Sequence, residues 1–459
     1  MSDLTTEFAD LQAALQEGIE RFSVPGASVG ILRGDETVFA AAGLLNARTG
    51  VEATPDSIFQ IGSITKTFTT TLVMQLVDEG RVELDRPVQT YLESFALGDA
   101  EAAAKITVRH LLTHTNGMDG DFFQDTGRGD DCVERYVLAC AALPQLHPVG
   151  EAFSYCNAGF AILGRLIERM TGMTWDAALK ERLLRGIGAK TMVTLPEEAL
   201  ALRVASGHIP PREDGGDWRV ARLQLLPRSN GPAGATPFAT TADLLAFARM
   251  HLRGGMAQEG TRVLSEASAN AMQTPQYTFD PAADPAHWGL GWMLFDWGGE
   301  RGFGHDGGTI GQSSFLRILP SKNAAVALLT NGGMTGLLYR DLFSMIFQRL
   351  AGIAPPELPE AIEGLQFDAA RYEGSYERIS SRIDVVGGDG GLDVTVTPRK
   401  VLVPGTPPQV IHFKPVDEQR FVSERAGWAP PQLITFGHFD ASGGAGSLFS
   451  GYRLNPRRP

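Results

Sequence analysis

Residues 56–70 read Asp-Ser-Ile-Phe-Gln-Ile-Gly-Ser-Ile-Thr-Lys-Thr-Phe-Thr-Thr, and they carry the strongest signal in the chain. A strand-like apolar run ends at Gly62, and a helix is predicted from Ser63 to Glu79. Residues three apart share one face of a helix, so the Lys66 amine can lie over the Ser63 hydroxyl. The start of a helix also favours developing negative charge. A neutral lysine one turn away can take the proton that makes a serine nucleophilic.

Lysine is scarce in this chain, which strengthens the pairing of Ser63 with Lys66. By itself, a serine three residues before a lysine is as readily explained by a helix cap followed by a solvated cation as by a catalytic pair. However, the chain has seven lysines against 33 arginines. Arginine cannot be deprotonated in a protein, so a lysine kept where arginine is the usual cation indicates a need for a removable proton.

Two further short elements follow along the chain. Tyr155-Cys156-Asn157 precedes an apolar helical stretch, and Gly304-His305-Asp306-Gly307-Gly308 is predicted to lie at a strand edge. The three elements in this order resemble the serine penicillin-recognising superfamily of β-lactamases, penicillin-binding proteins and related esterases and D-peptidases. The segments 106–118 and 232–235 resemble the same family, and the resemblance covers roughly residues 10–350.

The resemblance implies an α+β fold for residues 1–351, with an antiparallel sheet flanked by helices and a helical lobe. Residues 352–364 contain three prolines and are predicted to form a linker. Residues 365–459 alternate as short strands between glycine and proline turns, which predicts a small all-β domain that resembles a lipocalin-like barrel. The charge is also split, because residues 365–459 carry a net charge of about +1 out of −13 for the whole chain.

Composition excludes several classes of function. A net charge of −13 argues against binding to nucleic acid or to an anionic membrane, since both need basic surface. The acidic start and the lack of a long apolar run predict neither a signal peptide nor a membrane span, so a cytoplasmic enzyme is expected. The three cysteines, Cys132, Cys140 and Cys156, lack the spacing of a disulfide framework or zinc site. No metal and no cofactor are expected.

The resemblance implies a role for each site residue. Ser63 attacks a carbonyl and forms an acyl-enzyme, and Lys66 takes its proton. Tyr155 relays a proton to the leaving group. Asn157 orients Lys66, and His305 replaces the lysine that usually begins the third element. The backbone N–H groups of Ser63 and Gly308 form the oxyanion hole. A neutral histidine makes a strong site for a free carboxylate less favourable.

Within the superfamily, the chain resembles the penicillin-binding-protein-type thioesterases, which are stand-alone cyclases of nonribosomal peptide biosynthesis. The reaction so implied takes a peptidyl thioester, held on a carrier protein or a pantetheine-like group and ending in a D-residue, onto Ser63. Attack by the peptide's own N-terminal amine then gives a head-to-tail macrolactam. The residues themselves favour serine acyl transfer but leave water open as the acceptor. A cytoplasmic esterase, a D-aminopeptidase or other D-stereospecific peptidase, and a catalytically silent binding protein are the alternatives.

Three local predictions remain. Residues 288–295 are predicted to form one strand, with Trp288 and Trp292 on one face, walling a cleft or packing in the core. Residues 208–218 are predicted to form a polar loop that helps to shield the acyl-enzyme. Four histidines are expected to be structural: His110, His114, His208 and His287.

Overall fold

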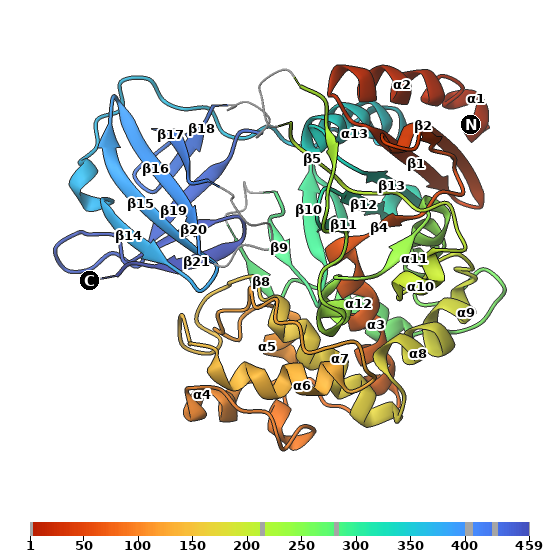
Figure 1. Ribbon diagram of the computed structural model, residues 1–459, viewed down its shortest axis with the longest axis horizontal. Coiled ribbons are helices and arrows are strands. Elements are labelled where there is room, and N and C mark those ends of the chain that lie inside the picture. Colours follow the sequence, from red (N-terminus) through yellow and green to blue (C-terminus); the bar gives the residue numbers. More distant parts are fainter. Residues whose placement is uncertain (1–2, 212–215, 280–283, 400–406, 425–429, 459) are drawn as a thin grey trace.

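The computed structural model describes residues 3–211, 216–279, 284–399, 407–424 and 430–458. Its centre is an antiparallel nine-stranded sheet in the order β3-β2-β1-β13-β12-β11-β10-β9-β8 (Figure 1). The strands of this sheet are β1 Gly26–Arg33, β2 Glu36–Asn46, β3 Val51–Glu52, β8 Tyr277–Thr278, β9 His287–Trp288, β10 Met293–Trp297, β11 Glu300–Gly308, β12 Ser313–Leu319 and β13 Ala324–Thr330. The α+β class and the antiparallel sheet predicted from the sequence are confirmed.

Helices cover both faces of this sheet. Helices α2 and α13, from opposite ends of residues 1–351, pack together on one face, and α11 packs on the other (Figure 1). The helices are α1 Leu4–Glu7, α2 Leu11–Arg21, α3 Thr65–Asp78, α4 Ala100–Lys105, α5 Val108–Leu112, α6 Cys132–Ala139, α7 Asn157–Thr171, α8 Trp175–Leu179, α9 Arg185–Ile187, α10 Pro196–Ala199, α11 Thr241–Leu252, α12 Glu266–Met272 and α13 Thr335–Ala351. None of the helices in the described ranges is both long and apolar enough to cross a membrane.

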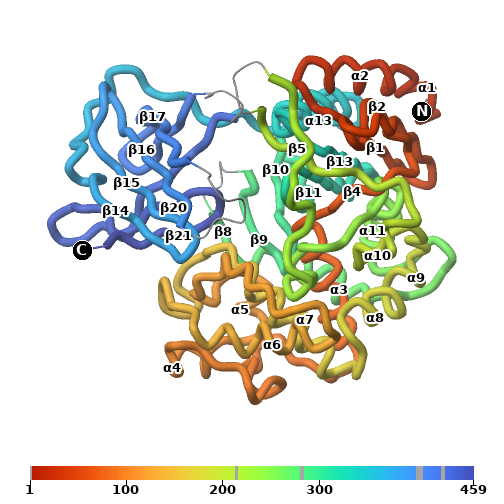
Figure 2. The backbone as a smooth tube through the Cα atoms, in the orientation of Figure 1, coloured from red at the N-terminus to blue at the C-terminus, as the bar shows by residue number. Residues whose placement is uncertain are grey.

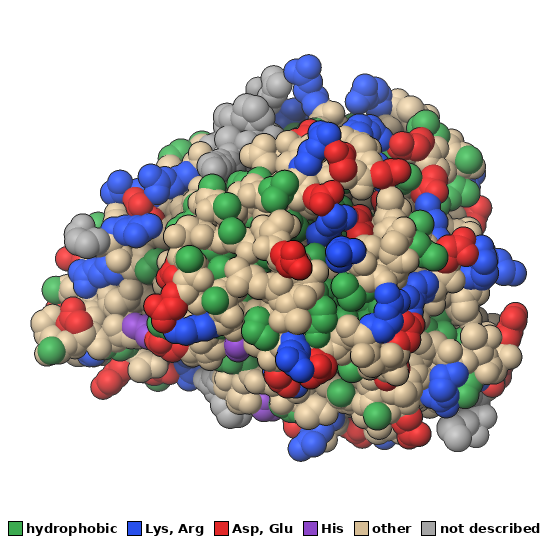
Figure 3. Space-filling model, turned by 90° about the horizontal axis from the view of Figure 1, so that it is seen from below, with side chains coloured by type: hydrophobic (Ala, Val, Ile, Leu, Met, Phe, Trp, Pro, Cys, Tyr) green, Lys and Arg blue, Asp and Glu red, His purple; other side chains and the backbone are tan. Residues whose placement is uncertain are grey.

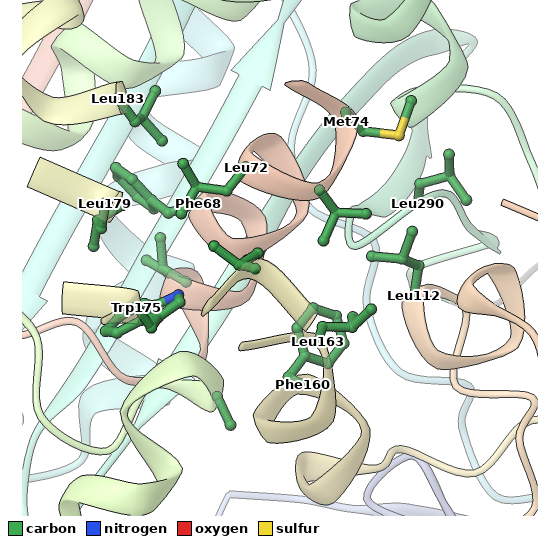
Figure 4. Packing of buried hydrophobic residues seen from close by; sticks show 14 of the residues in the cluster. Phe68, Leu72, Met74, Leu112, Phe160, Leu163, Trp175, Leu179, Leu183 and Leu290 are labelled. Atoms are coloured by element: carbon green, nitrogen blue, oxygen red, sulfur yellow. The ribbon is translucent and has the colours of Figure 1, made fainter. Parts of the chain in front are cut away.

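Helix α3 is buried in the centre of the hydrophobic core, where the helical lobe meets the sheet. Every residue from Thr65 to Leu76 is buried. Phe68 and Leu72 pack among side chains from several other helices, including Phe160 of α7 (Figure 4). Three of the threonines in α3 tolerate this burial because their hydroxyls donate to carbonyl oxygens one turn earlier, as Thr70 Oγ1 does to Lys66 O at 2.8 Å. The helix that carries Lys66 is therefore held rigidly.

The predicted strand at 288–295 is wrong, because the chain breaks it into β9 and β10. Gly291 has a φ of +71°, and a Cβ there would lie 2.2 Å from the Thr70 hydroxyl oxygen of α3. This tight turn separates the two tryptophans. Trp288 packs with Tyr155 in one core cluster, whereas Trp292 packs in the other. Trp292 therefore does not wall the cleft that Trp288 faces.

Strands β14 to β21 form an eight-stranded antiparallel sheet in sequential order. An isolated bridge between Tyr376 and Arg457 nearly closes it into the predicted barrel. The strands are β14 Gly374–Glu377, β15 Ser381–Gly388, β16 Gly391–Pro398, β17 Gln409–Pro415, β18 Arg420–Ser423, β19 Leu433–Gly437, β20 Ser447–Ser450 and β21 Arg453–Pro456. Residues 352–364 contain no helix or strand, and the boundaries of the linker stay a prediction.

The barrel lies against the rest of the chain at the point where the sheet meets the helical lobe (Figure 2). Seen from below, acidic and basic side chains are interspersed over the molecular surface (Figure 3). The predicted loop at 208–218 begins with the short strand β5, His208–Ile209, which pairs with β6, Arg219–Val220. Residues 212–215 of that predicted loop lie outside the described residues.

Candidate active site

Ser63 lies in a single 3-10 turn, Gly62–Ile64, that leads directly into α3. The α-helix begins two residues later than predicted, at Thr65. Gly62 has a φ of +49°, and a Cβ there would lie 2.6 Å from the Gly308 backbone nitrogen. Glycine therefore lets the Ser63 turn lie directly against the end of β11. The Gly308 nitrogen is adjacent to this turn, as an oxyanion hole shared by Ser63 and Gly308 requires.

The Lys66 amine is fully enclosed and has three close neighbours. Its Nζ lies 2.9 Å from Ser63 Oγ, 2.8 Å from Asn157 Oδ1 and 2.6 Å from the Ala233 carbonyl oxygen. The predicted i,i+3 contact between Ser63 and Lys66 is thus present. Asn157, the first residue of α7, reaches across to the same amine.

Burial controls the charge of Lys66. It lowers the pKa of the amine well below 10.5, and the positive charge of Arg453 lowers it further. A neutral amine suits the observed neighbours, because it can donate two protons to the oxygens of Asn157 and Ala233. Its lone pair is then free to accept the proton of the Ser63 hydroxyl. The geometry therefore matches a general base.

Tyr155 lies over this amine, with its ring centroid 4.9 Å from Lys66 Nζ. Burial raises the pKa of its phenol above the ordinary value, and the neighbouring Ser63 side chain offsets only part of the rise. The phenol therefore keeps its proton at neutral pH and can donate it. His114 stacks on the Tyr155 ring at 4.2 Å, and its Nδ1 accepts from the Cys156 backbone N–H at 2.9 Å. His114 is thus structural, as expected, and it supports the site.

A buried carboxylate, Asp121, joins the barrel to the site. Asn157 Nδ2 donates to Asp121 Oδ1 at 2.9 Å, which fixes the amide so that its oxygen faces Lys66. From the barrel, Arg453 Nε donates to Asp121 Oδ2 at 2.7 Å and Arg378 Nη1 donates to it at 2.9 Å. Burial by itself would raise the pKa of Asp121, but Arg453 and Arg378 outweigh it and hold that pKa well below its usual range.

His305 and Gly308 lie on β11, beyond the point where β10 stops pairing with it. His305 is therefore at a local strand edge, as predicted. Burial is the main cause that lowers its pKa to about 3. Its Nδ1 lies 2.6 Å from the Asp306 carbonyl oxygen, so the neutral ring carries its proton there and leaves Nε2 as an acceptor.

These residues open into a cavity of about 370 Å³. Its lining includes four predicted site side chains and apolar side chains such as Phe123, Leu226 and Met293. Tyr452, from the turn between β20 and β21, and Arg453, the first residue of β21, also line it. The Tyr155 backbone N–H donates to the Tyr452 carbonyl oxygen at 2.8 Å. The barrel therefore supplies part of the cavity wall.

The structure brings all of the predicted site residues together around Ser63. The sequence interpretation missed the second set of residues, which comprises Asp121, Arg378, Tyr452 and Arg453. No motif signals them, because Asp121 and Arg453 are 332 positions apart. In the described part of the chain, no group of three or more His, Cys, Asp or Glu side chains is arranged to hold a metal ion.

Comparisons with known proteins agree with this arrangement. The family model described as Beta-lactamase matches residues 11–341. The chain is 47% identical over 360 residues to Penicillin-binding protein 4 of Amycolatopsis lactamdurans, covering 77% of this chain and 93% of that protein. A crystal structure of SurE is similar at 29% identity, with a TM-score of 0.79 and 99% of each chain covered. A crystal structure of SurE with D-Leu is similar at 27% identity, with a TM-score of 0.72, covering 99% of this chain and 100% of that chain.

Proposed function

Because this chain belongs to the beta-lactamase family of penicillin-binding-protein-type serine enzymes, we propose that it cyclises peptides delivered as thioesters. A linear peptide on a carrier protein or a pantetheine-like thiol is transferred to Ser63. The N-terminal amine of the same peptide then displaces Ser63 and closes a head-to-tail macrolactam. The cyclase and the hydrolytic alternatives share one step, which is the acylation of a serine in a β-lactamase-like enzyme.

In the acylation step, neutral Lys66 takes the Ser63 proton as Oγ attacks the thioester carbonyl. The oxyanion so formed accepts hydrogen bonds from the N–H groups of Ser63 and Gly308, a contribution of about 3 kcal/mol for each donor. The C–S bond breaks, and the departing thiolate receives a proton from Lys66, with the Tyr155 phenol as the relay. Asp121 holds Asn157, and Asn157 holds Lys66, so the base keeps its position throughout.

In the release step, the neutral N-terminal amine attacks the ester carbonyl. A C–N bond forms, the C–O bond to Ser63 breaks, and the amine proton returns to Ser63 Oγ through Tyr155 and Lys66. A well-oriented tethered amine can reach an effective molarity of about 10⁵ M, which exceeds the roughly 55 M of water. The site therefore needs to fold the peptide back and limit water, rather than to activate the amine strongly.

The observation that carries the proposal is the cavity wall supplied by the barrel. Tyr452 and Arg453 narrow the space in front of Ser63, and the apolar lining disfavours free water there. Similarity to SurE over 99% of both chains, barrel included, supports a shared use of this wall. The SurE crystal structure with D-Leu supports a D-residue at the C-terminus of the peptide.

The test uses pantetheine thioesters of short peptides that end in D-Leu, in several lengths and sequences. With a free N-terminus, mass spectrometry should find mainly cyclic product. With an acetylated N-terminus, the same peptides should give slow hydrolysis, since no internal amine is present. Mainly linear acid from every free-amine peptide would reject the cyclase and favour a D-stereospecific hydrolase. Ser63→Ala should abolish both products.

A further inference from the structure

Asp306 is the one acidic side chain among the described residues that line the cavity. Arg453 is the one arginine or lysine there, and it is committed to Asp121. The Asp306 side chain is 38% exposed, and its Oδ1 accepts from Arg317 Nη1 at 2.6 Å. No residue in the described ranges donates a hydrogen bond to its second oxygen. One carboxylate oxygen is therefore available to a group that enters the cavity.

A second carboxylate lies behind Asp306. Arg317 is only 5% exposed and lies over the rings of Phe295 and Tyr339, at 4.4 and 4.9 Å. Asp284 accepts from the Trp297 indole N–H at 3.1 Å and interacts electrostatically with the same guanidinium. Arg317 thus interacts with two carboxylates, although Arg340 also acts on Asp284, so Arg317 neutralises the charge of Asp306 only in part. A cation that docks on Asp306 would neutralise the remainder.

Asp306 is also close to the reacting centre. It stands two residues before Gly308 on β11, and it lines the same cavity as Ser63 and Gly308. A group held by Asp306 is therefore near the carbonyl of an acyl group on Ser63. Peptide substrates carry one cationic group that must come to this carbonyl during cyclisation, and it is the N-terminal ammonium.

We propose that Asp306 binds the free α-ammonium group of the peptide substrate and places it next to the acyl carbonyl, with Arg317 and Asp284 as the supporting ion cluster. The assignment rests on the proposed peptide substrate, but it applies whether that peptide is cyclised or hydrolysed. Before cyclisation the ammonium gives one proton to neutral Lys66 and then attacks as the amine. Lys66 returns that proton to solvent after the product leaves.

The experiment compares wild type and Asp306→Asn with a D-Leu pantetheine thioester, with free and with acetylated N-terminus. The readout is the ratio of kcat/KM for the free-amine substrate to kcat/KM for the acetylated one, with cyclic and linear products counted together. This ratio should fall about tenfold in Asp306→Asn. Asp341→Asn removes an ion-paired aspartate on the outer side of α13, 3.5 Å from Arg21, and should leave the ratio at its wild-type value.

An unchanged ratio in folded Asp306→Asn would overturn the assignment, because a merely structural aspartate affects both substrates alike. A second measurement needs no variant. A peptide amide with a free N-terminus should inhibit the wild type about tenfold more strongly than its acetylated form, and equal inhibition would also overturn the assignment. Failure of the cyclase proposal is seen separately, as exclusively linear product from the wild type.

Discussion

Arg453→Gln should lower the free energy of unfolding by about 3 kcal/mol. Arg453 makes two charge-assisted hydrogen bonds to the two oxygens of Asp121, at 2.7 and 3.2 Å, and the Asp121 side chain is only 9% exposed. Removing one partner of a buried ion pair typically costs about 3–5 kcal/mol, because the other charge stays buried. Arg378 still binds Asp121 at 2.9 Å, so the lower end of this range is expected.

A double-mutant cycle isolates the interaction from other effects of each substitution. Urea unfolding of Arg453→Gln, Asp121→Asn and the double variant should give a coupling energy of about 2 kcal/mol. The chain offers a matched control in Arg109 and Asp85, which pair through the same atoms at 2.7 and 2.8 Å. The Asp85 side chain is 74% exposed, so its coupling energy should be about 0.2–1 kcal/mol. Equal coupling energies for the two pairs would refute the reasoning from burial.

Three other outcomes are expected. Lys66→Arg should slow acylation nearly as much as Lys66→Ala, because arginine keeps its proton; near-native stopped-flow rates would instead make Lys66 a fixed charge. The acylation rate of the wild type should rise with pH through a pKa well below 10.5, since burial favours the neutral Lys66 amine, and a rise centred near 10.5 would contradict this. Burial lowers the pKa of His251 and of His305 to about 3 from 6.5, so stability is full above 6.5 and is lost as the pH falls toward 3. Each histidine should lower the free energy of unfolding by about 2 kcal/mol when the pH falls from about 8 to 5. In urea unfolding of His251→Gln, the loss of stability over this pH range should be about 2 kcal/mol smaller than in the wild type.

Much of the site could be predicted because its parts are local. Ser63 and Lys66 are three residues apart on one turn, and strand alternation with glycine and proline turns predicted the barrel. The break between β9 and β10 could not be predicted in this way. The residue pattern alone favours a continuous strand at 288–295. The turn at Gly291 depends on the close approach of Thr70, which leaves no room for a Cβ at this position.

The sequence by itself determined the contact between Ser63 and Lys66 and the order of the three short elements, because these depend on backbone geometry within a few residues. The tertiary structure decided how that chemistry is controlled. The low pKa of Lys66 needs complete burial, and the orientation of Asn157 depends on Asp121, which two barrel arginines hold from positions more than 250 residues away. Desolvation and ion pairing between distant residues exist only after the chain has folded, so no local pattern encodes them.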